Sequence, residues 1–448
     1  MNARVARWRM AVGLALAMVL APPAQARADE IVVVTSFPPS FFEPYKAAFE
    51  AQSPGSTVTF VQRNTNSAVR FILERGDVTA DVFWASAVDA FEVLRSDGQL
   101  RENTPIAADA PAMVSGFPVN DPGGHYSGFA LSGYGFVYNS EYLAARGLPV
   151  PVNWSDLTLP VYSGHIGITS PSRSGTTHLV VEAILQKYGW NEGWALLSRL
   201  GGNLSTITAR SFGVASGVAQ GRFGIGITVD FLATAPEYLP GTTVFAMPPE
   251  TLFVPASIGT LTRSKNPALA EKFVAFVLSE AGQALLLDPA INRIPVSSRY
   301  AEAALARYPG VLDQPGLLGT SPFDAGLSAR RYELVNILFD EFIVRNRATL
   351  ARLWRQVNAQ QARGAATEPL AQAIGLLTRP PMAVEEAGNE TVMRGLRDTP
   401  TALPTSMDQA ALVNRVQADI AANLTAAEAM LTEIEVGQRV QRLNYVPR

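Results

Sequence analysis

The chain has 448 residues, of which 48% are hydrophobic and 17% charged, and its formal net charge is −3. This composition fits a large folded core, and the charge gives no reason to expect nucleic acid as a partner. The absence of cysteine excludes disulfides, thiol nucleophiles and thiolate metal sites.

Residues 1–28 have the organisation of a signal peptide. Three arginines precede the apolar run Met10–Ala21, and Ala24-Gln25-Ala26 fits a small-x-small cleavage site. The run is too short to span a bilayer, and no later run approaches the roughly 20 apolar residues that a membrane helix needs. We therefore expect a cleaved signal peptide and a periplasmic protein, with a retained anchor as the alternative.

The mature chain begins with alternating strands and helices. Strands are predicted at Ile31–Val34, Thr57–Val61 and Asp81–Trp84, and helices at Ser40–Gln52, Ser67–Arg75 and Val88–Leu94. This order implies an α/β fold with a parallel sheet and right-handed crossovers. Ligands of such sheets bind beyond the carboxyl ends of the strands.

Small polar residues follow each of these three strands. Ser36 follows the first strand, Asn64 and Thr65 follow the second, and Ser86 follows the third. Because these three loops follow parallel strands, they are predicted to lie at the same edge of the sheet and to form one wall of a polar cleft. Each loop alone also fits an ordinary turn with a helix N-cap.

The stretch Ile166–Tyr188 is the strongest candidate for a binding element. A strand at Ile166–Thr169 is followed by a polar loop and an apolar helix; the loop contains Ser172, Arg173, Ser174, Gly175 and Thr176. The first turn of a helix has unpaired amide protons and the positive end of the helix dipole, so hydroxyls and an arginine there predict an anion site. The alternative is that a hydroxyl only caps the helix and that Arg173 is solvated.

Two further candidates lie later in the chain. Arg210 and Ser211 stand at the start of a short helix, Ser211–Ala219, and are a second predicted anion contact. Asp230 follows a buried strand, Gly224–Val229, and is predicted to accept hydroxyls or to pair with an arginine. A surface arginine and a helix N-cap are the respective alternatives.

Regular elements are also predicted in the rest of this region. They are strands at Ser132–Tyr138, Thr243–Ala246 and Ala256–Leu261, and helices at Asn139–Arg146, Asn191–Leu200, Pro267–Leu278 and Ala281–Leu287.

Several motifs carry a resemblance to a known family. They are VVVTSF near the mature start, ADVFWAS at Ala80–Ser86, ITSPSRSGTTH at Ile168–His178, SKNPALAEKFVAFVLSEAGQALL at Ser264–Leu286 and NRIPV at Asn292–Val296. The chain resembles extracellular solute-binding proteins of ABC transporters, in the branch that includes ferric-iron binders. Within that branch it looks most like the phosphoglycerate transport regulatory protein subgroup.

The resemblance implies a two-lobed periplasmic-binding-protein fold of type II with a hinge. Lobe 1 would comprise residues 29–131 and 255–298, and lobe 2 would comprise residues 132–254. A ligand would bind between the lobes and stabilise the closed state.

Ferric-iron relatives present a tyrosine pair after the strand at Gly224–Val229. Here the sequence continues Asp230-Phe231-Leu232, Tyr238 stands alone, and the three histidines have no metal-ligand spacing. We therefore expect a small, phosphorylated organic anion and neither a metal nor another cofactor. A ferric-iron or other metal binder of the same fold is the alternative.

The resemblance also implies partners. The expected partner is an inner-membrane ABC permease or a sensor kinase, and the protein is expected to be a monomer. Nucleophile-elbow, zinc-protease and Walker motifs are absent from the sequence, so we expect no enzyme.

Residues 299–448 are predicted to form a helical C-terminal extension. Apolar spacing of three and four predicts helices at Ala301–Tyr308, Ala329–Gln361, Glu368–Leu377 and Met407–Gly437. The extension is either a helical cap on the lobes or a docking surface for a membrane sensor or permease.

Overall fold

The computed structural model describes residues 29–74, 80–234, 241–248, 251, 253–305, 323–365, 367–397 and 407–444. The predicted signal peptide and Tyr238 lie outside these residues. Within the described part of the chain, no helix is both long and apolar enough to cross a membrane.

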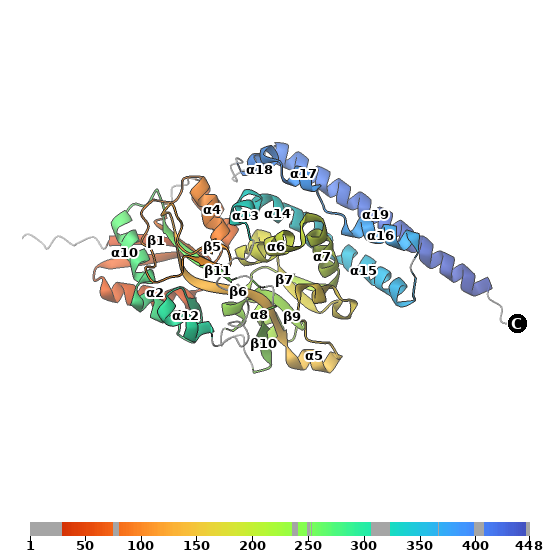
Figure 1. Cartoon of the computed structure of the whole chain (residues 1–448), viewed down its shortest axis with the longest axis horizontal. Coiled ribbons are helices and arrows are strands. Elements are labelled where there is room, and N and C mark those ends of the chain that lie inside the picture. Colours follow the sequence, from red (N-terminus) through yellow and green to blue (C-terminus); the bar gives the residue numbers. More distant parts are fainter. Residues whose placement is uncertain are drawn as a thin grey trace, which may run out of the picture.

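The fold is organised around one long strand, β6 (Ser127–Asn139). Its first half pairs antiparallel with β11 (Phe253–Thr260), and its second half pairs antiparallel with β9 (Ile225–Val229). The ten-stranded sheet has the order β2-β1-β3-β11-β6-β9-β7-β8, with β10 (Thr243–Ala246) and β12 (Ile294–Pro295) also paired to β6. Strand β6 therefore belongs to both lobes of a two-lobed α/β fold, as expected (Figure 1).

Lobe 1 is built on the predicted parallel sheet. Strand β1 (Asp29–Thr35) pairs parallel with β2 (Ser56–Gln62) and β3 (Val82–Ala85); β3 is fully buried, whereas β2 forms the half-buried edge of the sheet. Its helices are α2 (Pro39–Gln52), α3 (Thr65–Leu73), α4 (Val88–Ser96), α10 (Pro267–Leu278) and α11 (Glu280–Leu285). A small hairpin, β4 (Met113–Val114) and β5 (Phe117–Pro118), and helix α12 (Ser298–Leu305) accompany them.

Lobe 2 contains β7 (Ile166–Thr169), which pairs parallel with β9 and with β8 (Leu204–Thr208). Strand β8 was not predicted, since its polar sequence LSTIT has one buried side chain and forms the edge of the sheet. The surrounding helices are α5 (Ser140–Arg146), α6 (Gly175–Tyr188), α7 (Trp190–Asn203), α8 (Phe212–Ala219) and α9 (Asp230–Ala233). The turns η1 (Trp154–Thr158), η2 (Pro160–Tyr162) and η3 (Pro171–Arg173) complete the lobe.

The extension is helical, but the single helix predicted at Ala329–Gln361 is wrong. The chain there forms α13 (Ala325–Arg330), α14 (Tyr332–Phe339), the π-helical turn η5 (Asp340–Val344) and α15 (Arg347–Ala362). Arg331 and Asn346 leave the helical region, with φ near −105° and −103°, and break the helix twice. Apolar spacing alone could not show these breaks because it continues through them.

The rest of the extension covers lobe 2. Helices α16 (Glu368–Thr378), α17 (Val384–Ala387), α18 (Glu390–Arg397) and the 38-residue α19 (Met407–Asn444) follow in order. Side chains of α15, including Leu350 and Trp354, belong to the same buried cluster as those of α6 and α7. The extension and lobe 2 therefore share one core, and α19 runs along their outer side (Figure 1).

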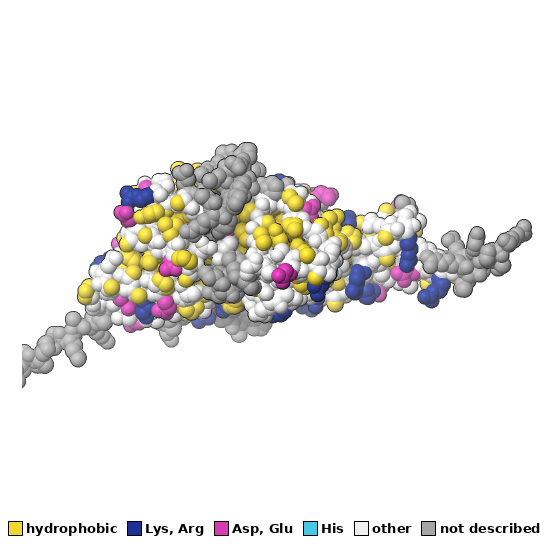
Figure 2. Space-filling view, turned by 90° about the horizontal axis from the view of Figure 1, so that it is seen from below, with side chains coloured by type: hydrophobic (Ala, Val, Ile, Leu, Met, Phe, Trp, Pro, Cys, Tyr) yellow, Lys and Arg dark blue, Asp and Glu magenta, His cyan; other side chains and the backbone are white. Residues whose placement is uncertain are grey.

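The face shown in Figure 2 carries scattered charges. Basic and acidic side chains alternate along it and reach onto the narrow C-terminal end. On this face, the basic residues do not gather into one large patch of the kind that binds nucleic acid.

Candidate functional site

The strand ends of lobe 1 form one edge of the candidate site. The Ser36 amide donates to the Trp84 carbonyl at 3.4 Å, and the Arg63 amide donates to the Thr35 carbonyl at 2.9 Å, so the three loops lie side by side. Ser36, Thr65 and Ser86 are half-buried or buried along this edge. Asn64 is the N-cap of α3, because its Oδ1 accepts from the Ser67 amide at 2.8 Å.

The strand ends of lobe 2 form the opposite edge. Ser174 is the N-cap of α6, where its Oγ accepts from the Thr177 amide at 3.2 Å, and it also lies 2.6 Å from Ser211 Oγ. The loop after β7 and the start of α8 are thus joined. Both Thr176 and Gly175 are buried in the first turn of α6.

The two edges meet at Gly175. A Cβ atom on this glycine would lie 2.4 Å from Ala87 Cβ and 3.1 Å from Thr65 Cγ2, both in lobe 1. Nearby, Asn66 Nδ2 donates to the Pro171 carbonyl at 3.4 Å. The lobes therefore stand closed, and glycine is needed at this position because any side chain would separate them.

Two predicted arginines lie away from this contact. Arg173 is exposed, as in the alternative interpretation of a solvated side chain. Arg210 is half-buried and lines a separate pocket of about 360 Å³ together with Arg222 and the hydroxyls of β8. Ser172 lies beside Ser170, with 2.7 Å between their Oγ atoms, and Ser170 donates to Asp340 of the extension.

Asp230 lies at the hinge and is fully buried. Its Oδ1 accepts from the Phe231 amide at 2.7 Å, and the Gly133 amide also lies against the carboxyl group, but Oδ2 makes no hydrogen bond of ordinary geometry within the described part of the chain. Burial raises the pKa of Asp230 to about 7, although the charge of Arg293 acts in the opposite direction. A carboxyl group with such a pKa can accept a hydrogen bond from a ligand hydroxyl when it is ionised, or donate a hydrogen bond to a ligand oxygen when it is protonated.

Arg293 is a residue of the hinge that the candidate set omitted. Its guanidinium is 1% exposed, lies 3.8 Å from the Phe231 ring centroid and 4.7 Å from that of Phe37, and donates from Nη2 to Ser132 Oγ at 2.6 Å. The aromatic rings come from both lobes, so the cation bridges them. Arg293 belongs to the NRIPV motif that carries the family resemblance, but the sequence could not show which side of β6 its side chain approaches.

Tyr134 is a second omitted residue. It pairs with Val229 on β9, directly before Asp230. Burial raises the pKa of the Tyr134 phenol well above its ordinary value, and the charges of Asp89 and Asp230 act in the same direction. Tyr134 OH and Ser36 Oγ are both buried without a hydrogen-bond partner among the described residues.

The buried side chains Asp89, His178 and Ser328 do not form a hydrolase triad. Asp89 Oδ2 lies 3.3 Å from His178 Nε2, and Ser328 Oγ lies 3.4 Å from the same nitrogen. In a triad the acid must orient the ring from the nitrogen opposite the serine. Among the described residues, no group of three His, Cys, Asp or Glu side chains could hold a metal ion.

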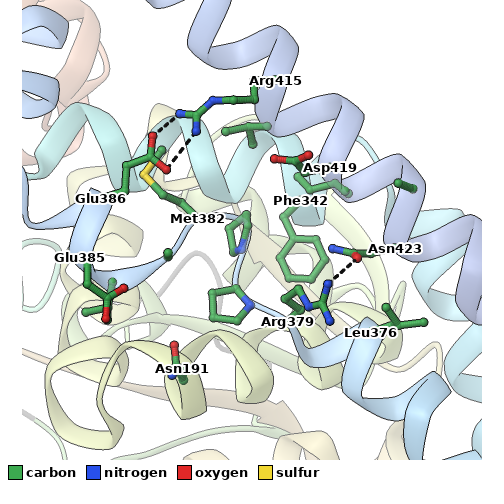
Figure 3. Close-up of a pocket in the computed structure, with 17 residues that line it drawn as sticks. Asn191, Phe342, Leu376, Arg379, Met382, Glu385, Glu386, Arg415, Asp419 and Asn423 are labelled. Carbon is green, nitrogen blue, oxygen red and sulfur yellow. Dashed lines mark hydrogen bonds and ion pairs between the residues drawn. The ribbon is translucent and has the colours of Figure 1, made fainter.

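A surface pocket lies in the extension (Figure 3). This pocket of about 540 Å³ lies between α7, the segment before α17, and α19. Arg379 donates to Asn423 at 3.2 Å and Arg415 is paired with Glu386 on its rim. The carboxylates of Glu385 and Asp419 also line this pocket.

The family model for bacterial extracellular solute-binding proteins matches residues 77–309. Together with the fold, this match shows that the chain belongs to that family of binding proteins. A relative from Salmonella typhimurium (strain LT2), the phosphoglycerate transport regulatory protein PgtC, is 30% identical over 368 residues, covering 82% of this chain and 89% of PgtC.

Solved structures show the same fold. The periplasmic binding protein AfuA from Actinobacillus pleuropneumoniae, with exogenous fructose-6-phosphate bound, has a TM-score of 0.61 at 20% identity and covers 70% of this chain and 99% of its own. Iron-bound HitA from Pseudomonas aeruginosa has a TM-score of 0.57 at 19% identity. The superposition covers 69% of this chain and 98% of the HitA chain. At these identities the likeness concerns the fold alone.

Proposed function

We propose that this protein captures a small, phosphorylated organic anion of the phosphoglycerate kind between its lobes. It then presents the solute in the periplasm to an inner-membrane ABC permease or a sensor kinase, without chemical conversion. The name of PgtC and the fructose-6-phosphate bound to AfuA support a phosphorylated solute.

One observation carries the proposal. Ser36 Oγ and Tyr134 OH are buried at the closed interface between the lobes and lack hydrogen-bond partners within the described chain, and Asp230 Oδ2 makes no hydrogen bond of ordinary geometry there. Buried polar atoms are normally paired, and leaving one unpaired costs roughly 1–3 kcal/mol. A solute with hydroxyl and acidic oxygens would supply the missing partners.

Electrostatics favour an anion at this place. Arg293 provides a buried positive charge at the hinge, and the N-terminus of α6 contributes the positive end of its dipole beside Gly175. Asp230 then favours a solute that also carries a hydroxyl group, because the hydroxyl donates to Oδ2. A phosphorylated hydroxy acid combines both features.

A thermal-shift panel tests the proposal. The mature protein, from Asp29, is heated with 3-phosphoglycerate, 2-phosphoglycerate, phosphoenolpyruvate, inorganic phosphate, glycerate or ferric citrate. A solute at 100 times its dissociation constant stabilises the protein by about 2.7 kcal/mol, which is readily observed. Stabilisation by phosphorylated acids supports the proposal.

Ferric iron is the second candidate solute. The fold that this chain shares with iron-bound HitA favours it, whereas the residues that we describe at the hinge offer one carboxylate, Asp230, beside the cation of Arg293. A hard trivalent cation prefers several anionic oxygen ligands. Stabilisation by ferric citrate alone would replace the first proposal by this one.

A further inference from the structure

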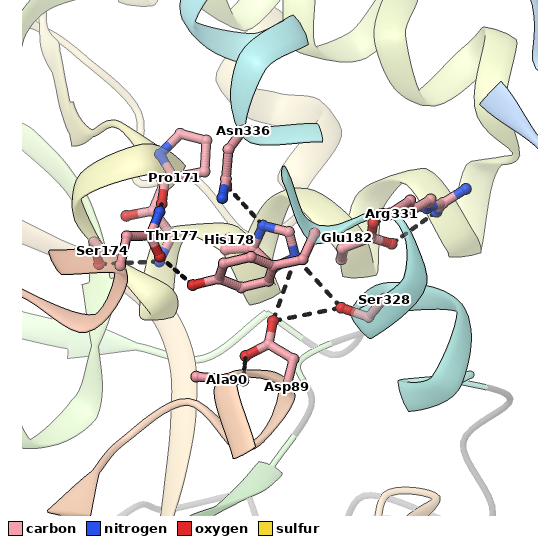
Figure 4. A network of polar contacts seen from close by, with 12 residues as sticks. Asp89, Ala90, Pro171, Ser174, Thr177, His178, Glu182, Ser328, Arg331 and Asn336 are labelled. Carbon is pink, nitrogen blue, oxygen red and sulfur yellow. Dashed lines mark hydrogen bonds and ion pairs between the residues drawn. The ribbon is translucent and has the colours of Figure 1, made fainter. Parts of the chain in front are cut away.

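The C-terminal extension touches both lobes at the closed interface. Helix α13 lies beside α4 of lobe 1, and α14 lies against α6 of lobe 2 (Figure 1). A network of buried polar side chains fills this junction (Figure 4). The network adjoins the hinge, since the charge of Asp89 acts on the Tyr134 phenol, but the proposed function gives the network no role.

The extension is fixed to lobe 2 by strong contacts. Arg331 donates to both carboxylate oxygens of Glu182, each at 2.7 Å, and Glu182 is fully buried. Asn336 Oδ1 lies 2.9 Å from His178 Nδ1. Beyond these, α15 packs closely on α7: a Cβ atom on Gly202 would lie 2.6 Å from Trp354. The extension therefore moves with lobe 2.

The extension also contacts lobe 1, where α13 packs along α4 and polar side chains meet. Tyr332 OH donates to Asn66 Oδ1, and Ser328 Oγ donates to Asp89 Oδ2 at 3.4 Å. The rings of Phe323 and Phe117 lie 4.7 Å apart at the edge of this contact. All four polar side chains are buried.

The same two residues of lobe 1 also bind lobe 2. Asp89 Oδ2 lies 3.3 Å from His178 Nε2, and Asn66 Nδ2 donates to the Pro171 carbonyl. Asn66 and Asp89 thus each contact lobe 2 and the extension at once. If the lobes rotate apart, both sets of contacts break together, because the extension stays with lobe 2.

We propose that the extension is a latch: Ser328 and Tyr332, carried on lobe 2, bind Asp89 and Asn66 of lobe 1 only in the closed arrangement and so set the closure equilibrium of the cleft. The proposal deepens the proposed function, since a solute bound between the lobes is held more tightly when the closed state is more populated. By linkage, solute binding strengthens the latch contacts by the same factor.

The test measures the distance between the lobes without any solute. Cysteines introduced at the exposed positions Ala47, on α2 of lobe 1, and Ser155, on η1 of lobe 2, carry spin labels, and the natural chain has no other cysteine to label. Gly175→Leu provides the reference for the open state, because its side chain collides with Ala87. Pulsed electron resonance then gives the populations of both distances.

The latch variant is Ser328→Ala/Tyr332→Phe, which removes two hydroxyls and keeps the packing. It should raise the ratio of open to closed molecules at least tenfold, toward the Gly175→Leu distance. The matched control is Ser198→Ala/Tyr162→Phe, whose hydroxyls donate to the Leu377 and Pro149 carbonyls without reaching lobe 1. The control should keep the wild-type distribution.

Two results would overturn the latch. One is a distribution in the latch variant that equals that of the wild type. The other is a wild-type protein that is already as open as Gly175→Leu. Neither result depends on a solute, so failure of the latch is distinguishable from failure of the proposed function, which is tested separately by adding 3-phosphoglycerate to the same labelled proteins.

Discussion

Asp89 of α4 and His178 of α6 face each other across the two lobes, with 3.3 Å between Oδ2 and Nε2 and both side chains fully buried. Burial raises the pKa of Asp89 to about 8 and lowers that of His178 to about 4. Since His178 Nδ1 donates to Asn336 Oδ1, its Nε2 is free to accept the proton of a neutral Asp89 carboxyl. The two groups thus form a neutral pair near pH 6.

This pair predicts a pH dependence of stability. Between pH 6.5 and 8 the folded protein keeps a proton on Asp89 that the unfolded chain has released, so stability falls as pH rises, by at most about 1.4 kcal/mol per pH unit. Asp230 adds to this slope up to about pH 7. Below pH 6.5, His178 has the opposite effect on stability. Its imidazole binds a proton in the unfolded chain but stays neutral in the folded protein.

Urea unfolding of wild type and Asp89→Asn at pH 6.5, 7.25 and 8 checks this expectation. The groups around Asp89 are His178 and Glu182 on α6, Ser328 on α13, and the two tyrosines Tyr134 and Tyr332. The variant should lose most of the slope between pH 7.25 and 8. An unchanged slope would show that Asp89 is ionised in the folded protein.

The ion pair of Glu182 with Arg331 predicts a large loss of stability when it is broken. Arg331→Met leaves a fully buried carboxylate without its partner, which should cost about 3–5 kcal/mol in urea unfolding. The double variant Glu182→Met/Arg331→Met should recover most of this loss. The control is Arg415→Met, whose half-exposed pair with Glu386 should contribute no more than about 1 kcal/mol. Equal effects of Arg331→Met and Arg415→Met would contradict the structure.

Truncation tests whether the extension shares the core of lobe 2. Removal of residues 323–448 uncovers α7, because Leu350, Leu353, Trp354 and Val357 of α15 are buried in the common cluster. The shortened chain should aggregate or lose cooperative thermal unfolding. A chain that ends at Glu435 should keep the wild-type melting temperature within a few degrees, because Val436 and Val440 at the end of α19 are 56% and 49% exposed. A stable, cooperative chain without residues 323–448 would refute the shared core.

Arg173→Ala separates binding from stability. Because the side chain is exposed, its removal should change the unfolding free energy by less than about 0.5 kcal/mol. If Arg173 reaches the solute at the N-terminus of α6, the affinity for 3-phosphoglycerate should fall at least tenfold, whereas the exposed lobe 1 variant Arg263→Ala keeps it. Equal affinities of the two variants would remove Arg173 from the site and leave Arg293 as its main cation.

Much of the fold could be predicted from the sequence because its elements carry local signals. The boundaries of β7, β10 and α10 agree with those expected, and Asn266 caps α10 just before a proline. The breaks at Arg331 and Asn346 carry no such signal, and β8 is a polar edge strand. Local patterns therefore failed where backbone geometry depends on packing.

The candidate site was predicted only in part, for a related reason. Thr65 contacts Gly175, and Ser174 contacts Ser211, because the topology of parallel strands dictates where their ends lie. The contacts of Asp89 with Ser328 and of Asn66 with Tyr332 join residues 239 and 266 positions apart. Such pairs depend on how the extension docks on the lobes, which periodicity does not encode.

The central claim is that the cleft binds a phosphorylated acid. Isothermal titration calorimetry of the mature protein with 3-phosphoglycerate, and in parallel with glycerate, tests it most directly. We predict saturable binding of one 3-phosphoglycerate per chain, at least tenfold tighter than glycerate, because the phosphate supplies the charge that Arg293 and the N-terminus of α6 attract. Absence of binding by 3-phosphoglycerate and the other phosphorylated acids of the panel, together with binding of ferric citrate, would contradict the account.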